Sequence, residues 1–159
     1  MYFKRIDVLY FIEHKDREIE VAKKIAKKLN AEYGLNIAIV SQLFDAVTAL
    51  FKFTPKVVIT PTPSFSKGSA AWMFHKIYSN NIKFVSLNFE QFLGSWESGS
   101  KMVFSDFTKT HQKHCAWGDE FKNLLVKKGI DNKNIHVTGR PTDSLVNTEY
   151  KTKKKQLKK

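Results

Sequence analysis

Residues 6–40 read IDVLYFIEHKDREIEVAKKIAKKLNAEYGLNIAIV, a strand, a helix and a second strand in succession. The run 6–12 is almost continuously apolar, as expected for a strand that is covered on both faces. Residues 17–33 place their apolar side chains on one stripe of a helix, with Lys and Glu opposite. Asp16 is positioned to cap the start of this helix, and Gly34 suits its end.

The same alternation continues to the end of the chain. Apolar strands are expected at 37–40, 57–60, 82–87, 114–117 and 135–138, and helices at 43–53, 69–79 and 119–128. Pro55 marks the exit from the second helix, and residues 88–112 show no regular pattern. We therefore predict an α/β fold: a Rossmann-like, doubly wound and mostly parallel sheet with helices on both faces. In such folds, ligands bind outside the carboxyl ends of the strands.

Length and composition favour one basic domain. The 159 residues carry a net charge of +12, with six lysines among the last nine residues. We expect a domain over 1–146 and a basic linker or tail over 147–159. The single cysteine, Cys115, excludes an internal disulfide framework and favours a reducing compartment. No apolar stretch approaches the ~20 residues of a membrane span, so we expect a cytoplasmic protein, or a peripheral one at the inner face of the membrane.

The turn after the first strand holds the strongest candidate site. Glu13 is a candidate base, His14 adds an imidazole, and Arg17 is a candidate substrate-binding cation. This turn should open onto the ligand crevice of a doubly wound fold. The alternative interpretation is an ordinary charged turn in which Asp16 and Glu18 cap the helix.

Two later loops carry further candidates. Ser66 and Lys67 precede a helix N-terminus and could hold a phosphate or a sugar, although the order of residues is not that of a P-loop. After the fourth strand, Asn88 and Gln91 offer the donors and acceptors that recognise sugar hydroxyls, and Glu90 is a second candidate base. A glycine hinge in the first loop and loop anchoring in the second are the alternatives.

A metal site is not predicted. His111, His114 and Cys115 lie close in sequence, but no second ligand cluster completes the four ligands of a structural zinc site. We expect these residues to enter a buried strand instead.

The end of the chain carries the most specific pattern. Residues 114–146 read HCAWGDEFKNLLVKKGIDNKNIHVTGRPTDSLV. An apolar strand ends in Trp117-Gly118, an acid-started helix follows, and a last strand ends in Thr138-Gly139 before Pro141. This pattern resembles the end of the N-terminal domain of bacterial surface-carbohydrate glycosyltransferases of GT-B architecture. The likeness extends to relatives of CDP-glycerol glycerophosphotransferases.

The resemblance implies two Rossmann-like domains that face each other across a cleft. The N-terminal domain takes a glycan or lipid-linked acceptor, and the C-terminal domain binds a nucleotide-activated sugar or CDP-polyol donor. It implies that the donor domain lies beyond this chain, that the chain alone is inactive, and that no metal is required. Arg140 would lie at the interdomain cleft and contact phosphate or orient the substrate.

Other classes of function stay open. A stand-alone flavodoxin-like binding module and half of a sugar-nucleotide epimerase share this alternation of elements. The basic charge suits an anionic membrane surface, a phosphorylated substrate or an ordinary lysine-rich surface. No nucleic-acid-binding motif occurs, so we expect no specific nucleic-acid partner.

Overall fold

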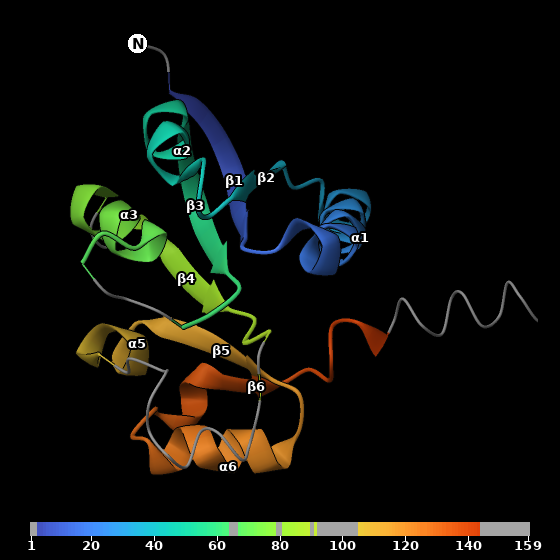
Figure 1. The fold of residues 1–159 in the computed structure, drawn as a ribbon, viewed down its shortest axis with the longest axis vertical. Coiled ribbons are helices and arrows are strands. Elements are labelled where there is room, and N and C mark those ends of the chain that lie inside the picture. The colour runs from blue at the N-terminus through green and yellow to red at the C-terminus, as the bar shows by residue number, and fades with distance from the viewer. Residues whose placement is uncertain (1–2, 64–66, 79–80, 90, 92–104, 144–159) are drawn as a thin grey trace, which may run out of the picture.

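A computed structural model describes residues 3–63, 67–78, 81–89, 91 and 105–143. Its centre is a six-stranded sheet in the order β2-β1-β3-β4-β5-β6, and every neighbouring pair is parallel (Figure 1). The strands are β1 (Lys4–Ile12), β2 (Ile37–Ser41), β3 (Phe53–Thr60), β4 (Lys83–Ser86), β5 (Gln112–Ala116) and β6 (Ile135–Val137). The sheet confirms the predicted α/β, Rossmann-like fold class.

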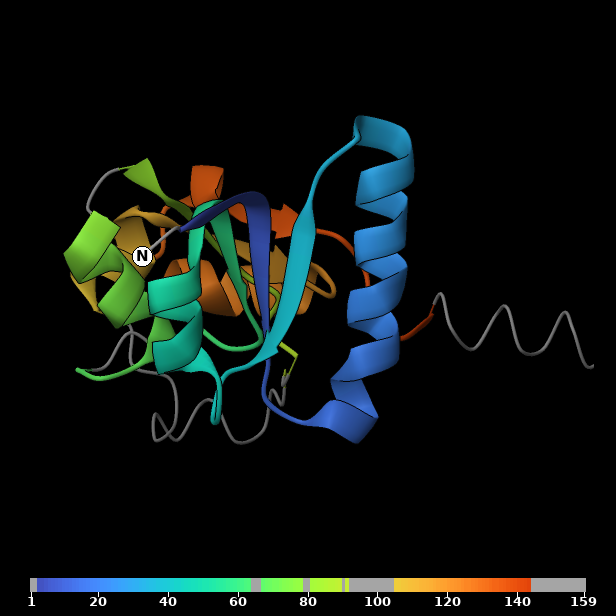
Figure 2. The same ribbon diagram turned by 90° about the horizontal axis from the view of Figure 1, so that it is seen from above.

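Helices flank the sheet. They are α1 (Lys15–Tyr33), α2 (Ala46–Lys52), α3 (Ala70–Tyr78), α5 (Asp106–Thr110) and α6 (Asp119–Lys127), with a short 3₁₀ turn, η2 (Asn132–Asn134). Figures 1 and 2 show α2 and α3 side by side on the far side of the sheet from α1. This arrangement follows from right-handed crossovers, because the chain leaves β1 toward β2 in one direction and then crosses back to β3.

Alternation along β1 divides the core between the two faces. Tyr10 packs on the α1 side with Val21 of that helix. Leu9 and Phe11 pack on the other side, with Phe74 of α3. All five side chains are at most 2% exposed, so β1 is covered on both faces, as its continuous apolar sequence predicts.

Most predicted boundaries lie within a few residues of those observed, and two local predictions are wrong. The second helix is shorter than expected, because the chain first forms a turn and the helix begins only at Ala46, and because the strand after it already begins at Phe53. Pro55 therefore lies inside β3. Pro55 lies opposite Ile6 of β1. On the other side of β3, β4 begins only opposite Val57, so no described strand is paired with β3 there and the missing N–H of Pro55 is tolerated.

Two features near helix starts also differ from the sequence interpretation. α1 begins at Lys15 with His14 as its N-cap, so Asp16 lies in the first turn and does not cap the helix. The short helix α5 falls in a region where no element was expected. Its signal is Ser105, whose hydroxyl accepts a hydrogen bond from the Thr108 N–H at the N-cap.

Candidate functional site

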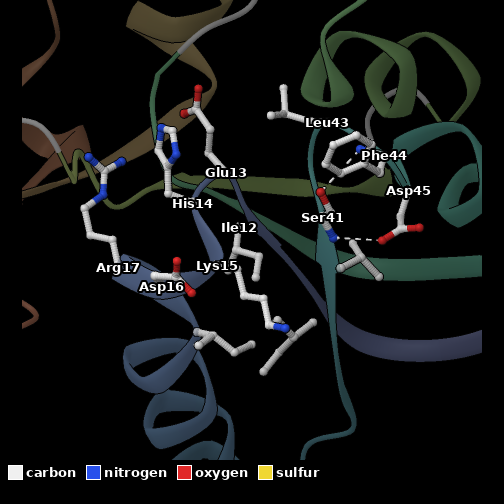
Figure 3. A pocket seen from close by; sticks show the side chains of 13 residues that line it. Ile12, Glu13, His14, Lys15, Asp16, Arg17, Ser41, Leu43, Phe44 and Asp45 are labelled. Atoms are coloured by element: carbon white, nitrogen blue, oxygen red, sulfur yellow. Dashed lines mark hydrogen bonds between the residues drawn. The ribbon is translucent and has the colours of Figure 1, made fainter.

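A pocket of about 770 Å³ lies at the carboxyl ends of β1 and β2. The turn from β1 into α1 forms one side of it, and the turn from β2 into α2 forms the other (Figure 3). Apolar side chains of the strands and of α1 also line it, namely Ile12, Ile19, Ile39 and Val40. The pocket is therefore placed where open α/β sheets bind ligands.

Three of the predicted site residues line this pocket: Glu13, His14 and Arg17. In Figure 3, the Glu13 and His14 side chains stand side by side at the end of β1. Glu13 is half-buried, whereas His14 is exposed. A carboxylate and an imidazole thus share one wall, where each can exchange a proton or a hydrogen bond with a ligand hydroxyl.

Glu18 fixes the backbone of this wall. Its side chain is fully buried, with one carboxylate oxygen 2.8 Å from the N–H of Glu13, which donates to it. The guanidinium of Arg17 donates to the other oxygen at 2.8 Å. Glu18 therefore ties the end of β1 to the first turn of α1, but it does not cap the helix: the bonded N–H belongs to the residue before the N-cap, His14, and no side chain caps α1.

Tyr10 lies beneath the same turn. Its hydroxyl is buried and has no hydrogen-bond partner among the described residues. Burial raises the pKa of Tyr10 well above its usual range, and the negative charge of Glu18 raises it further. The phenol is therefore neutral at physiological pH.

The opposite wall comes from the turn between β2 and α2, which the sequence interpretation left without site residues. Leu43 and Phe44 face Glu13 and His14 across the opening (Figure 3). Phe44 is 85% exposed. The turn is held by Asp45, whose carboxylate accepts the Ser41 N–H at 3.2 Å, and by the Ser41 hydroxyl, which accepts the Phe44 N–H at 3.3 Å. The carboxyl ends of parallel strands meet at one edge, so the sequence pointed to the turn after β2 as part of this edge but not to the individual residues that face Glu13.

Asn88 and Gln91 do not line the pocket, and their side chains bond to backbone instead. The amide of Asn88 donates to the carbonyl of Cys115 at 3.0 Å. The side-chain amide of Gln91 donates to the carbonyl of Asn88 at 2.9 Å, and its oxygen accepts the backbone N–H of Trp117 at 2.9 Å. Asn88 also has a left-handed backbone, with φ 49°, a conformation that Asn tolerates better than most residues. Loop anchoring accounts for these contacts, and substrate binding by either residue stays a prediction.

The remaining predicted site residues are spread over the carboxyl edge or lie outside the described residues. Lys67 is exposed before α3 and does not line the pocket. The guanidinium of Arg140 lies 5.0 Å from the ring centre of Trp117, a cation–π contact between the segments that follow β5 and β6. Ser66 and Glu90 lie outside the described residues.

The histidine and cysteine of β5 lie within the sheet, as expected. His114 is fully buried, and its Nε2 is 2.7 Å from the carbonyl oxygen of Thr108. Burial lowers the pKa of His114 and raises that of the neighbouring Cys115 thiol. In the part of the chain that the structure describes, no three His, Cys, Asp or Glu side chains form a group that could hold a metal ion.

None of the helices over the described ranges combines the length and the apolar character of a membrane span. No family model and no curated protein matches this chain.

Proposed function

We propose that this chain is the acceptor-binding domain of a GT-B-type glycosyltransferase of surface-polysaccharide synthesis, and that its pocket binds a hydroxyl-bearing acceptor. The observation that carries the proposal is the pairing of Glu13 and His14 at the carboxyl end of β1, across from Phe44. Pockets of this kind, with a few polar groups facing an apolar wall, suit small amphipathic ligands. A sugar has such a character, with hydroxyls at its edge and an apolar ring face.

The charges around the pocket support an uncharged acceptor over a polyphosphate. The N-terminus of a helix attracts anions, but the carboxylate of Glu18 already lies at the start of α1. Among the groups that line the pocket, Glu13, Asp16 and Asp45 offset Lys15 and Arg17. A phosphate would meet three carboxylates here, whereas a hydroxyl finds both acceptors and donors.

Sugar transfer needs a base to take the proton of the attacking hydroxyl, and the base must lie within hydrogen-bond reach of it. Glu13 and His14 are the described residues that suit this role, and Glu90 stays a candidate from its sequence. The donor in this proposal is a nucleotide-activated sugar, or a CDP-polyol in a close variant, held by a partner domain. The assay that follows therefore measures binding of the acceptor.

A flavodoxin-like binding module is the second candidate, because the order β2-β1-β3-β4-β5 is that of flavodoxin-like folds. Such folds bind FMN at the switch point between β1 and β3, with the phosphate near the turn after β1. That turn contains Glu13 and Asp16, and Glu18 bonds to its backbone. We therefore expect no binding of FMN. Quenching of flavin fluorescence on addition of the protein would favour this second candidate instead.

Ligand-observed NMR tests the proposed function. We expect saturation-transfer signals from one or more ligands in a panel of neutral hexoses, N-acetylhexosamines and the polyol glycerol. Glu13→Gln should weaken this binding about tenfold or more, because it removes a charged acceptor. Glu20→Gln is the matched control, since Glu20 lies exposed on α1 outside the pocket. Equal effects of the two substitutions, or no sugar bound at all, would count against the proposal.

A further inference from the structure

Exposed apolar side chains gather around α2 and α3. Nine large apolar side chains are exposed in the described residues, and six of them belong to this region. The six are Phe3, Leu43, Phe44, Val47, Phe51 and Ile77. We refer to these residues, with α2 and α3 themselves, as the α2–α3 surface. Single exposed apolar residues are normal, but a concentration of them around two neighbouring helices indicates a binding face.

The helices explain why these side chains share one face. Val47 and Phe51 are one helical turn apart, on the side of α2 that is turned away from the core. Ile77 lies on α3, close to the end of α2, because the hydroxyl of the next residue, Tyr78, donates to the carbonyl of Leu50 at 3.1 Å. Figure 1 shows the two helices adjacent on this side of the sheet.

The charge around this surface is predominantly positive. Residues 46–89 contain no Asp or Glu but five lysines, of which Lys56 is paired with Asp7, and the exposed Asp45 lies just before α2. Lys52 on α2 and Lys76 on α3 are both exposed. Lys4, at the start of β1, is a further exposed lysine; in the register of the sheet it lies opposite Phe53, the residue just after α2. The opposite face differs, because α1 mixes its lysines with three exposed acidic residues, Asp16, Glu20 and Glu32.

We propose that the α2–α3 surface docks on an anionic lipid bilayer. Peripheral membrane binding combines apolar side chains that enter the interface with lysines that meet anionic headgroups. A nucleic acid would satisfy the lysines but leave Val47 and Ile77 without an apolar environment. This inference does not depend on the sugar-binding proposal, although Phe44 links the two sites. Docking by this face would bring the pocket to the membrane surface, within reach of a lipid-linked acceptor.

Vesicle co-sedimentation tests the apolar component. The protein should bind vesicles of phosphatidylcholine mixed with phosphatidylglycerol, and bind vesicles of phosphatidylcholine alone far more weakly. The double variant Val47→Ser, Phe51→Ser leaves the pocket residues in place and should lose most of this binding. Tyr33→Ser is the control, because Tyr33 is 68% exposed at the end of α1, on the other face. Equal urea midpoints for wild type and variants would show that the fold is kept.

A second pair of variants tests the charge component. Lys52→Gln with Lys76→Gln should weaken binding to the anionic vesicles about 30-fold at low salt, because each lysine near such a surface contributes separately. Lys27→Gln with Lys127→Gln removes the same charge from α1 and α6 and should have a much smaller effect. Added salt should weaken binding of the wild type more than that of the Lys52, Lys76 variant.

Five results would overturn the proposal, the first four of them in experiments with vesicles or with the protein alone. These four are no binding to anionic vesicles, equal binding to neutral ones, losses that are as large in the controls, and a concentration-dependent dimer that disappears in the Val47, Phe51 variant. The fourth result would assign the surface to a second copy of the chain. Binding to duplex DNA that depends on Lys52 and Lys76 but not on Val47 and Phe51 would likewise assign it to nucleic acid.

Discussion

Glu18 shows how one buried carboxylate can shape a site without lining it. It has no exposed surface, yet it accepts the N–H of Glu13 and the guanidinium of Arg17. Both partners line the pocket. Glu18 is therefore a positioning residue, and the direction of the Glu13 backbone depends on it.

Replacing Glu18 with Ala should lower the free energy of unfolding by about 2 kcal/mol or more, because the N–H of Glu13 would be left without its acceptor. Glu18→Gln should cost less, since its amide oxygen can still accept that N–H. Urea unfolding measures both. Glu20→Ala is the control, because the Glu20–Lys23 pair is exposed and should contribute less than about 1 kcal/mol. A Glu18→Ala variant as stable as the control would contradict this role.

His114 should make stability depend on pH. Burial holds its pKa below the usual value, so the unfolded chain binds the proton more readily than the folded chain. Stability should therefore fall as the pH drops from about 7.5 to 5.5, through the pKa of an unfolded histidine. Carboxylates stay ionised in this range and contribute little to the change. His75 shifts in the same direction but is less buried.

Urea midpoints across this pH range check the assignment. His114→Gln should flatten the dependence more than His75→Gln does, because the ring of His114 is the more deeply buried. An unchanged slope in His114→Gln would show that another group carries the effect.

At the scale of elements, Gly34 ends α1 with φ 65°, a conformation that side chains with a Cβ adopt only at a cost. Gly34→Ala should lower the free energy of unfolding by about 1 kcal/mol, although no atom within 4 Å would clash with the added methyl group. Gly118→Ser is the comparison, because Gly118 caps α6 with extended backbone that any residue adopts. We expect that variant to be neutral or slightly stabilising, and equal losses would refute the conformational explanation.

Gln91 connects the segment after β4 to the end of β5, through the carbonyl of Asn88 and the N–H of Trp117. Gln91→Leu should therefore cost about 1–3 kcal/mol of stability by leaving these backbone groups without partners. Gln91→Glu keeps an acceptor for the Trp117 N–H and should cost less. If Gln91→Leu changed sugar binding and not the urea midpoint, a substrate-binding role would be favoured over anchoring.

The elements were largely predictable because buried parallel strands and amphipathic helices leave strong patterns. β1 and α1 are the clearest examples, with Gly34 at the helix end. The start of β3 was not predictable, because a proline usually argues against a strand. Pro55 is tolerated here because β4 pairs with β3 only from Val57 onward. Five residues of α5 are too few to show a period, so its Ser105 cap was the available signal.

At the scale of the whole molecule, the site depends on the order of the strands. β1 and β2 are neighbours, so the turns after them meet at one edge. The sequence could predict Glu13, His14 and Arg17, because they follow directly on the first strand. It could not place Phe44 opposite them, since that requires the length of the β2–α2 turn and the position of α2.

Backbone amide shifts locate the binding site most directly. A ¹H–¹⁵N NMR titration of the chain with a neutral sugar that binds should shift the amides of residues 13–19 and 41–45, the two turns that line the pocket. Amides around Asn88, Gln91 and Arg140 should move little, and Glu13→Gln should reduce the shifts. Shifts confined to those other residues, with the pocket amides unchanged, would contradict the assignment of this pocket as the acceptor site.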